Sequence, residues 1–155
     1  MVLSSVVLPH AASAAAAPRP NIIVIFTDDQ GYQDLGCFGS TTIKTPNLDR
    51  MAAGGLMLKG FYAQPVCGVS RAALMTGSYP IRVGEPGNLK RLHTVPHPQE
   101  LTMAEVLKSA GYATGIIGKW HLGVWANNQP QHHPLAHGFD FHFGLMHSNL
   151  SLIHI

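Results

Sequence analysis

Residues 21–27 (NIIVIFT) constrain the fold more than any other part of the sequence. The run is continuously apolar from Ile22 to Phe26 and rich in β-branched residues, with no alternation of apolar and polar positions. This pattern predicts a strand that is buried on both faces, as in the parallel sheet of an α/β protein. Asp28 and Asp29 follow directly, at the carboxyl end of the predicted strand, where open α/β sheets bind their ligands.

Helix and strand signals alternate along the rest of the chain. Thr45-Pro46 predicts the start of a helix that Gly54-Gly55 ends, and Thr102 with Glu105 has the spacing of a capping box. The other predicted elements are a strand over 56–63, a helix over 70–75 ending at Gly77, a helix from 103 ending at Gly111, and a strand over 112–117. The alternation predicts an α/β sheet whose faces are covered by helices.

The composition favours a folded chain and argues against a nucleic-acid-binding protein. Of the 155 residues, 46% are hydrophobic and 12% are charged, which allows a packed core and argues against disorder. The formal charge of +2 is small and the basic residues are scattered, whereas nucleic-acid binding requires a basic stripe. Cys37 and Cys67 allow at most one disulfide, no CxxC zinc motif is present, and Cys37 is expected to be a small core residue.

The histidines are unusually numerous. There are ten, and most lie after residue 90, partly within the proline- and histidine-rich stretches 84–99 and 126–138, which predict loops. His132 and His133 are expected to be solvated loop residues, and His137 is expected to cap or pack near the glycine that follows it.

At both ends of the chain the sequence predicts a segment that lies outside the folded domain. Residues 1–17 are apolar and small with Ala-x-Ala spacings, which predicts a secretory signal peptide and a periplasmic or secreted protein; a disordered Ala-rich leader is the alternative. No membrane span is predicted, because Pro9 and His10 interrupt a run shorter than the ~20 residues needed. Residues 150–155 (LSLIHI) read like a translated sequencing-library adapter and predict a non-native tail, with a short native strand as the alternative.

The adjacent carboxylates Asp28 and Asp29 are a candidate metal site. Two neighbouring carboxylates repel one another, and a hard cation is a common reason to hold them at one point. A turn in which one Asp caps a helix would explain the same pair without a metal, so both interpretations stay open.

Cys67 and Arg71 belong to the segment CGVSRAALMTG, residues 67–77. A cysteine just before a helix lies where backbone N–H groups and the helix dipole stabilise negative charge. Arg71 would lie one helical turn away and would add a fixed cation. A lone cysteine is more often a buried structural thiol, but Cys-x-x-x-Arg followed by Ala-Leu-x-Thr-Gly is uncommon by chance.

Lys119 and His121 lie in the segment GKWHLG, residues 118–123, directly after a predicted strand. They are two positions apart, so in an extended chain their side chains point to the same side. A cation and an imidazole on one face suit an anionic substrate and a proton-transfer step. Two solvated loop residues are the alternative interpretation.

Together these segments resemble the sulfatase family, in its type I, formylglycine-dependent branch within the alkaline phosphatase superfamily. The resemblance covers residues 20–149. It rests on PNIIVIFTDDQGYQDLGCFG, TPNLDRMAAGG, the cysteine segment and GYATGIIGKWHLG, in the family's order and approximate spacing, and HGFDFHFGL fits weakly. It implies an α/β fold, the N-terminal part of an alkaline-phosphatase-like sandwich with a central, mostly parallel sheet flanked by helices, incomplete in this chain.

The resemblance also implies a nucleophile and a metal site. Cys67 would be oxidised by a formylglycine-generating maturase, and the hydrate of the resulting formylglycine would attack the sulfur of a sulfate ester. Asp28 and Asp29, together with an oxygen at position 67, would hold a calcium ion, or a magnesium ion. The substrate would be a sulfated small molecule or carbohydrate, as in arylsulfatases.

The other candidate residues receive their roles from the same resemblance. Arg71 would steady the hydrate, Lys119 would bind the sulfate, and His121 would take a proton from the second hydroxyl of the hydrate. Ser148 lies where the family often has a further hydrogen-bonding serine. A geminal diol has one hydroxyl to attack and keeps another to expel sulfate, which a plain serine could not do.

Two departures from the family pattern bear on these expectations. Val69 stands where the family usually has proline, although valine also favours extended backbone and is compatible with maturation. The family's remaining metal ligands and its later histidine and lysine would lie beyond position 155, so the chain by itself is expected to be inactive. A phosphonate or phosphodiester hydrolase of the same superfamily and a non-catalytic, degenerate chain are the alternative interpretations.

Overall fold

The computed structural model describes residues 19–83, 99–123 and 130–146. Its elements, with η for a 3-10 helix, are η1 (Tyr32–Asp34), η2 (Gly36–Phe38), α1 (Pro46–Gly54), α2 (Cys67–Thr76), η3 (Pro80–Val83), α3 (Met103–Ser109), β1 (Gly115–Ile117), η5 (Pro130–His132), η6 (Pro134–His137) and β2 (Phe141–Phe143). The predicted leader at 1–17, the predicted tail at 150–155, Ser148 and most of the predicted loop at 84–99 lie outside the described residues. No helix within the described ranges is both long enough and apolar enough to cross a membrane.

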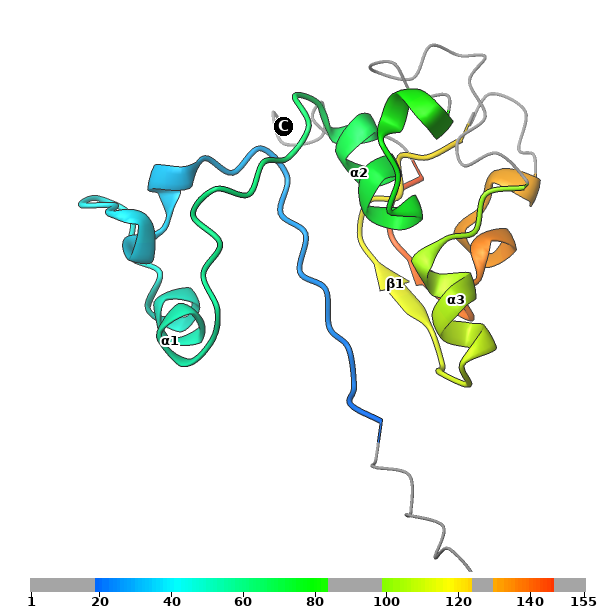
Figure 1. Cartoon of the computed structure of the whole chain (residues 1–155), viewed down its shortest axis with the longest axis horizontal. Coiled ribbons are helices and arrows are strands. Elements are labelled where there is room, and N and C mark those ends of the chain that lie inside the picture. Colours follow the sequence, from blue (N-terminus) through cyan, green and yellow to red (C-terminus); the bar gives the residue numbers. More distant parts are fainter. Residues whose placement is uncertain (1–18, 84–98, 124–129, 147–155) are drawn as a thin grey trace, which may run out of the picture.

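The core forms where α2, α3 and a small parallel sheet meet (Figure 1). β1 and β2 pair in parallel, with Gly115 opposite Phe141 and Ile117 opposite Phe143. The buried core side chains are Ala72, Val83, Ala104, Trp120, Leu122 and Phe139. Helices on a parallel sheet confirm the predicted α/β class. α1, with η1 and η2, lies apart from this core (Figure 1).

Helix α2 begins at the cysteine itself. Val66, the residue before it, has extended backbone, and its carbonyl accepts the Ser70 N–H at 3.1 Å, which closes the first helical turn. At the other end Gly77 is left-handed (φ 63°), and its N–H donates to the Ala73 carbonyl. The predicted end of this helix is therefore confirmed, whereas its predicted start at residue 70 was one turn too late. Cys67 is the first residue of the helix rather than a residue just before it.

The predicted cap of α3 is confirmed. The Thr102 hydroxyl accepts the Glu105 N–H at 3.2 Å, and the Glu105 carboxylate accepts the Thr102 N–H at 2.7 Å. Thr102 is fully buried, and its hydroxyl also donates to the His137 carbonyl at 2.8 Å. This residue therefore starts α3 and ties it to η6. The helix predicted at Pro46 is confirmed as well, as α1.

Residues 21–27 are extended but do not form a strand, so this prediction was wrong (Figure 1). Ile23 is 85% exposed, and the described sheet contains only β1 and β2. The predicted strand at 56–63 is also irregular, with Leu56 86% exposed. An apolar run becomes a buried strand only where neighbouring strands accept its hydrogen bonds, and no described strand does so for either segment.

The segment after residue 130 is more ordered than predicted. η5 and η6 replace the expected loop, and His132 and His137 are both buried. His137 packs as expected, stacked on Trp120 with ring centroids 5.8 Å apart. The prediction that His132 is solvated was wrong, because the residue is buried. Its backbone carbonyl accepts the Trp120 indole N–H at 3.0 Å. Strand β2 was not predicted at all, and β1 is shorter than the predicted strand at 112–117.

Candidate functional site

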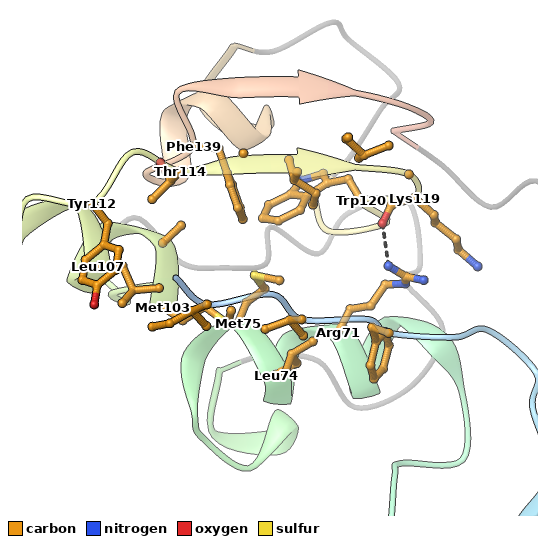
Figure 2. A pocket seen from close by; sticks show the side chains of 18 of the residues that line it. Arg71, Leu74, Met75, Met103, Leu107, Tyr112, Thr114, Lys119, Trp120 and Phe139 are labelled. Carbon is orange, nitrogen blue, oxygen red and sulfur yellow. Dashed lines mark hydrogen bonds between the residues drawn. The ribbon is translucent and has the colours of Figure 1, made fainter. Parts of the chain in front are cut away.

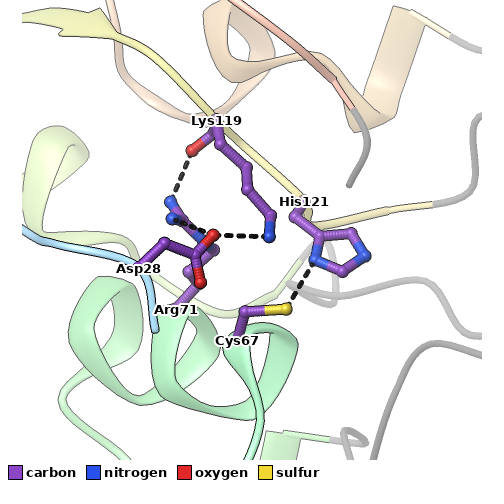
Figure 3. A network of polar contacts seen from close by, with 5 residues as sticks. All are labelled: Asp28, Cys67, Arg71, Lys119 and His121. Carbon is purple, nitrogen blue, oxygen red and sulfur yellow. Dashed lines mark hydrogen bonds and ion pairs between the residues drawn. The ribbon is translucent and has the colours of Figure 1, made fainter. Parts of the chain in front are cut away.

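Five side chains from three distant segments converge at one end of α2 (Figure 3). Asp28 follows the extended segment 21–27, Cys67 and Arg71 lie on the first two turns of α2, and Lys119 and His121 lie in the loop after β1. All five were predicted from the sequence as candidate site residues, and the fold brings them together.

Asp28 is held between two cations. Its Oδ2 accepts a hydrogen bond from the Lys119 Nζ at 2.6 Å, and the Arg71 Nη2 lies 3.6 Å from the same oxygen. Lys119 is only 6% exposed at its side chain, whereas Asp28 is 30% exposed. Burial opposes ionisation of Asp28, but the Lys119 hydrogen bond and the positive charges of Lys119 and Arg71 together lower its pKa. The carboxylate is therefore ionised at neutral pH.

Arg71 is fixed by contacts on three sides. Its Nη1 donates to the Lys119 backbone carbonyl, its guanidinium faces Asp28, and its Cζ lies 5.3 Å from the Phe26 ring centroid. Burial lowers the pKa of Arg71, and the negative charge of Asp28 opposes that shift. Arginine remains charged under such conditions, so the site keeps a rigid planar cation.

Cys67 faces His121. The Cys67 Sγ lies 3.3 Å from the His121 Nδ1, within hydrogen-bonding distance for sulfur. Because Cys67 is the first residue of α2, its side chain lies beside the unpaired N–H groups and the positive end of the helix dipole. The geometry therefore joins a polarised position on a helix to an imidazole that can exchange a proton with it.

The loop after β1 is held by the chain that continues β2. The N–H groups of Gly118, Trp120 and His121 donate to the carbonyls of Phe143, Leu145 and Met146. The side chain between the two site residues, Trp120, is 1% exposed and anchors in the core. Lys119 and His121 thus both reach the site. The assumption of extended backbone was wrong at His121, which is left-handed (φ 54°).

The loop's anchors were missed by sequence reasoning. The Trp120 indole contacts the η5 carbonyl of His132, and its ring meets Phe139 edge-on at 6.0 Å. A tryptophan between two polar site residues is a detectable signal, because such alternation indicates one polar face and one buried face. The partner residues on η5 could not be inferred, since they depend on tertiary packing.

Asp29 makes no hydrogen bond or ion pair with the five clustered side chains. Asp29 is exposed and left-handed (φ 54°), an uncommon conformation that aspartate tolerates better than most residues. Ser148 lies outside the described residues.

The carboxylates fit a hard cation as part of a larger ligand shell. Asp28 is ionised, and carboxylate oxygens are the donors that calcium prefers. Calcium takes six to eight oxygens. Within the described ranges no group of three or more His, Cys, Asp or Glu side chains is placed to hold a metal ion. Asp28 and Asp29 can therefore contribute to a calcium site but cannot complete one by themselves.

A cavity of about 540 Å³ lies behind the two cations (Figure 2). Arg71 and Lys119 stand at one end of it, and Leu107 and Tyr112 stand at the other. Apolar residues of α2, α3, β1 and the segment 21–27 form its walls, whereas neither Cys67 nor His121 lines it. The cavity therefore adjoins three of the five clustered side chains, Asp28, Arg71 and Lys119, but its lining does not include the Cys67–His121 pair.

The chain matches known proteins over most of its length. The sequence profile described as "Sulfatase" matches residues 20–151. The chain is 45% identical over 149 residues to human steryl-sulfatase, covering 90% of this chain and 26% of that protein. It is 49% identical over 140 residues to pig N-acetylgalactosamine-6-sulfatase, covering 83% and 26%. It is 47% identical over 152 residues to bovine arylsulfatase A, covering 95% and 29%. The chain thus spans about a quarter of the length of these relatives.

Solved structures agree with these sequence matches. The crystal structure of Ps i-CgsB superposes with a TM-score of 0.71 at 40% identity, over 78% of this chain and 27% of that one. A second structure, from work on glycosaminoglycan metabolism in Bacteroides thetaiotaomicron, superposes with a TM-score of 0.73 at 38% identity, over 83% and 28%. The described fold is therefore shared with larger proteins of known structure.

Proposed function

The chain belongs to the sulfatase family, and on this premise we propose that its protein hydrolyses sulfate esters with a formylglycine made from Cys67. One observation carries the proposal. The Cys67 side chain, the imidazole of His121 and the cations Arg71 and Lys119 meet at the N-terminus of α2. An anionic sulfate ester needs such a combination of nucleophile position, proton acceptor and positive charge.

Each residue at this site would have a separate role in hydrolysis. The hydrate of formylglycine, once formed, supplies one hydroxyl to attack sulfur and a second hydroxyl that must lose its proton for sulfate to leave. His121, 3.3 Å from the side chain of residue 67, is placed to take that proton. Lys119 and Arg71 would offset negative charge on the sulfate oxygens, and Arg71, which is held by the Lys119 carbonyl and Asp28, would steady the hydrate at position 67.

Asp28 and Asp29 would be two of the ligands of a calcium ion, with magnesium as the other candidate. The ion would supply further positive charge next to the sulfate oxygens. Asp28 supports this role because it is already ionised and already binds cations, namely Lys119 and Arg71. Ser148 would add a hydrogen bond to the substrate.

The substrate class proposed is a sulfated small molecule or carbohydrate. The named relatives act on a steroid sulfate, a sulfated sugar and aryl sulfates, as their names state, and one similar structure contains a k-i-k-neocarrahexaose. A formylglycine-generating maturase would be the partner that modifies Cys67. The apolar leader at 1–17 supports export to the periplasm or to the outside of the cell.

The test uses the full-length protein co-expressed with a maturase. 4-Nitrophenyl sulfate should be hydrolysed much faster than bis(4-nitrophenyl) phosphate or a phosphonate monoester, as expected for a sulfatase. Cys67→Ala should abolish turnover. Cys37→Ser is the matched control, because Cys37 is the chain's other cysteine, is also free and partly buried, and lies in η2, apart from the cluster. A preference for the phosphorus esters, or full activity in Cys67→Ala, would refute the proposal.

A further inference from the structure

The loop that leads into Cys67 is held by hydrogen bonds from the side chain of Ser70. Most helices begin with a residue whose side chain caps the free N–H groups, but Val66 precedes α2 and cannot do so. Ser70, on the first turn of α2, folds its hydroxyl back onto the peptide groups of Gln64 instead. Its Oγ accepts the Gln64 N–H at 3.0 Å and donates to the Gln64 carbonyl at 3.1 Å.

These two hydrogen bonds, here called the Ser70 clasp, are partly buried, because Ser70 is buried whereas Gln64 is exposed. Ser70 is 9% exposed, and Gly68 and Val69 before it are also buried. The Ser70 N–H donates to the Val66 carbonyl at 3.1 Å, so the same residue holds the loop at two points. The chain from 64 to 70 is thereby a closed loop, and Cys67 lies in its middle.

We propose that Ser70 is a positioning residue for the reaction at Cys67. This inference rests on the proposed function. Both bonds of the hydroxyl go to Gln64, so Ser70 acts on the reacting group only through the loop. What the clasp fixes is the direction in which residue 67 leaves the helix, and hence its 3.3 Å approach to His121.

The expected signature is a loss of turnover without a loss of substrate binding. A displacement of about 1 Å at a reacting group can cost on the order of 100-fold in rate. Ser70→Ala should therefore lower kcat by roughly 10- to 100-fold. KM should change by less than about twofold, because Arg71 and Lys119 are held by Asp28 and by each other rather than by Ser70.

The experiment compares three variants in the full-length protein, with kcat divided by the measured fraction of formylglycine. Ser70→Ala should show the loss of kcat, and Ser70→Thr, which keeps the hydroxyl, should recover most of it. Thr76→Val is the matched control. The Thr76 hydroxyl also donates one bond and accepts one, to Ala72 and from Ser78, at the far end of the same helix. Equal kcat in Ser70→Ala and Thr76→Val would overturn the proposal.

A second readout needs neither maturation nor activity. In protein made without maturase, iodoacetamide should alkylate Cys67 at least about threefold faster in Ser70→Ala than in Thr76→Val, because the loop is released. Equal alkylation rates, or a melting temperature far below that of Thr76→Val, would overturn the positioning role. If the wild-type protein does not hydrolyse 4-nitrophenyl sulfate, the proposed function fails, while the alkylation comparison still tests the clasp.

Discussion

Replacing Thr102 by valine removes a hydroxyl that forms hydrogen bonds with both α3 and η6, and the loss of unfolding free energy follows from these contacts. The side chain is fully buried, it caps α3 through the Glu105 N–H, and it donates to the His137 carbonyl in η6. Loss of an N-terminal cap costs about 1 kcal/mol. Leaving a buried carbonyl unpaired costs a further ~1–3 kcal/mol. Thr102→Val, which keeps the shape of the side chain, should therefore lower the free energy of unfolding by about 2–4 kcal/mol.

Urea unfolding followed by far-UV circular dichroism measures this loss as a lower midpoint at an unchanged m-value. Thr102→Ser is the matched control, because it keeps the hydroxyl and loses one methyl group, for a cost of about 1 kcal/mol. If Thr102→Val is as stable as Thr102→Ser, the Thr102 hydroxyl does not join α3 to η6.

Three further predictions concern charge. Lys108 lowers the pKa of Asp140 to about 2, so this carboxylate stabilises the fold above its ordinary pKa, and that stabilisation is lost as the pH falls toward 2. Asp140→Asn should therefore flatten the melting temperature profile between about pH 4 and pH 2, and an unchanged profile would contradict this. Burial lowers the pKa of His137, so stability should decline as the pH falls below the ordinary histidine value of 6.5, and His137→Gln should weaken that decline in thermal melts. In calorimetry of the full-length protein, Asp28→Asn should weaken calcium binding by at least about tenfold, whereas Lys119→Met should strengthen it by removing a competing cation. If both variants bind calcium as tightly as the wild type, Asp28 is not a calcium ligand.

Local signals in the sequence were sufficient for α1, for α3 and for the end of α2. The Thr102–Glu105 box, Pro46 and Gly77 each act through their own backbone or near neighbours, so caps and ends could be predicted. The strands depend on partners far along the chain. Residues 21–27 have a strand composition, yet they remain unpaired among the described residues, while the short strand β2 pairs in spite of carrying His142 at its centre.

The site was predictable for a different reason. Cys67 and Arg71 lie one turn apart on a helix, and Lys119 and His121 lie two apart in a loop, so each pair is local. Their convergence on Asp28 was expected only from the resemblance, because no local signal joins segments that lie far apart in the sequence. The left-handed backbone of His121, the anchoring of the loop by Trp120 and the contact of Ser70 with Gln64 depend on tertiary packing and could not be read from the sequence.

The most direct test of the central claim is the mass of the tryptic peptide 60–71 from the full-length protein co-expressed with a maturase. This peptide contains Cys67 and ends at Arg71. Replacing CH₂SH by CHO lowers its mass by about 18 Da, and the aldehyde should also react with a hydrazide probe. Formylglycine at position 67 predicts this lighter, hydrazide-reactive peptide in the fraction that hydrolyses 4-nitrophenyl sulfate. A peptide with the full thiol mass in an active enzyme would contradict it.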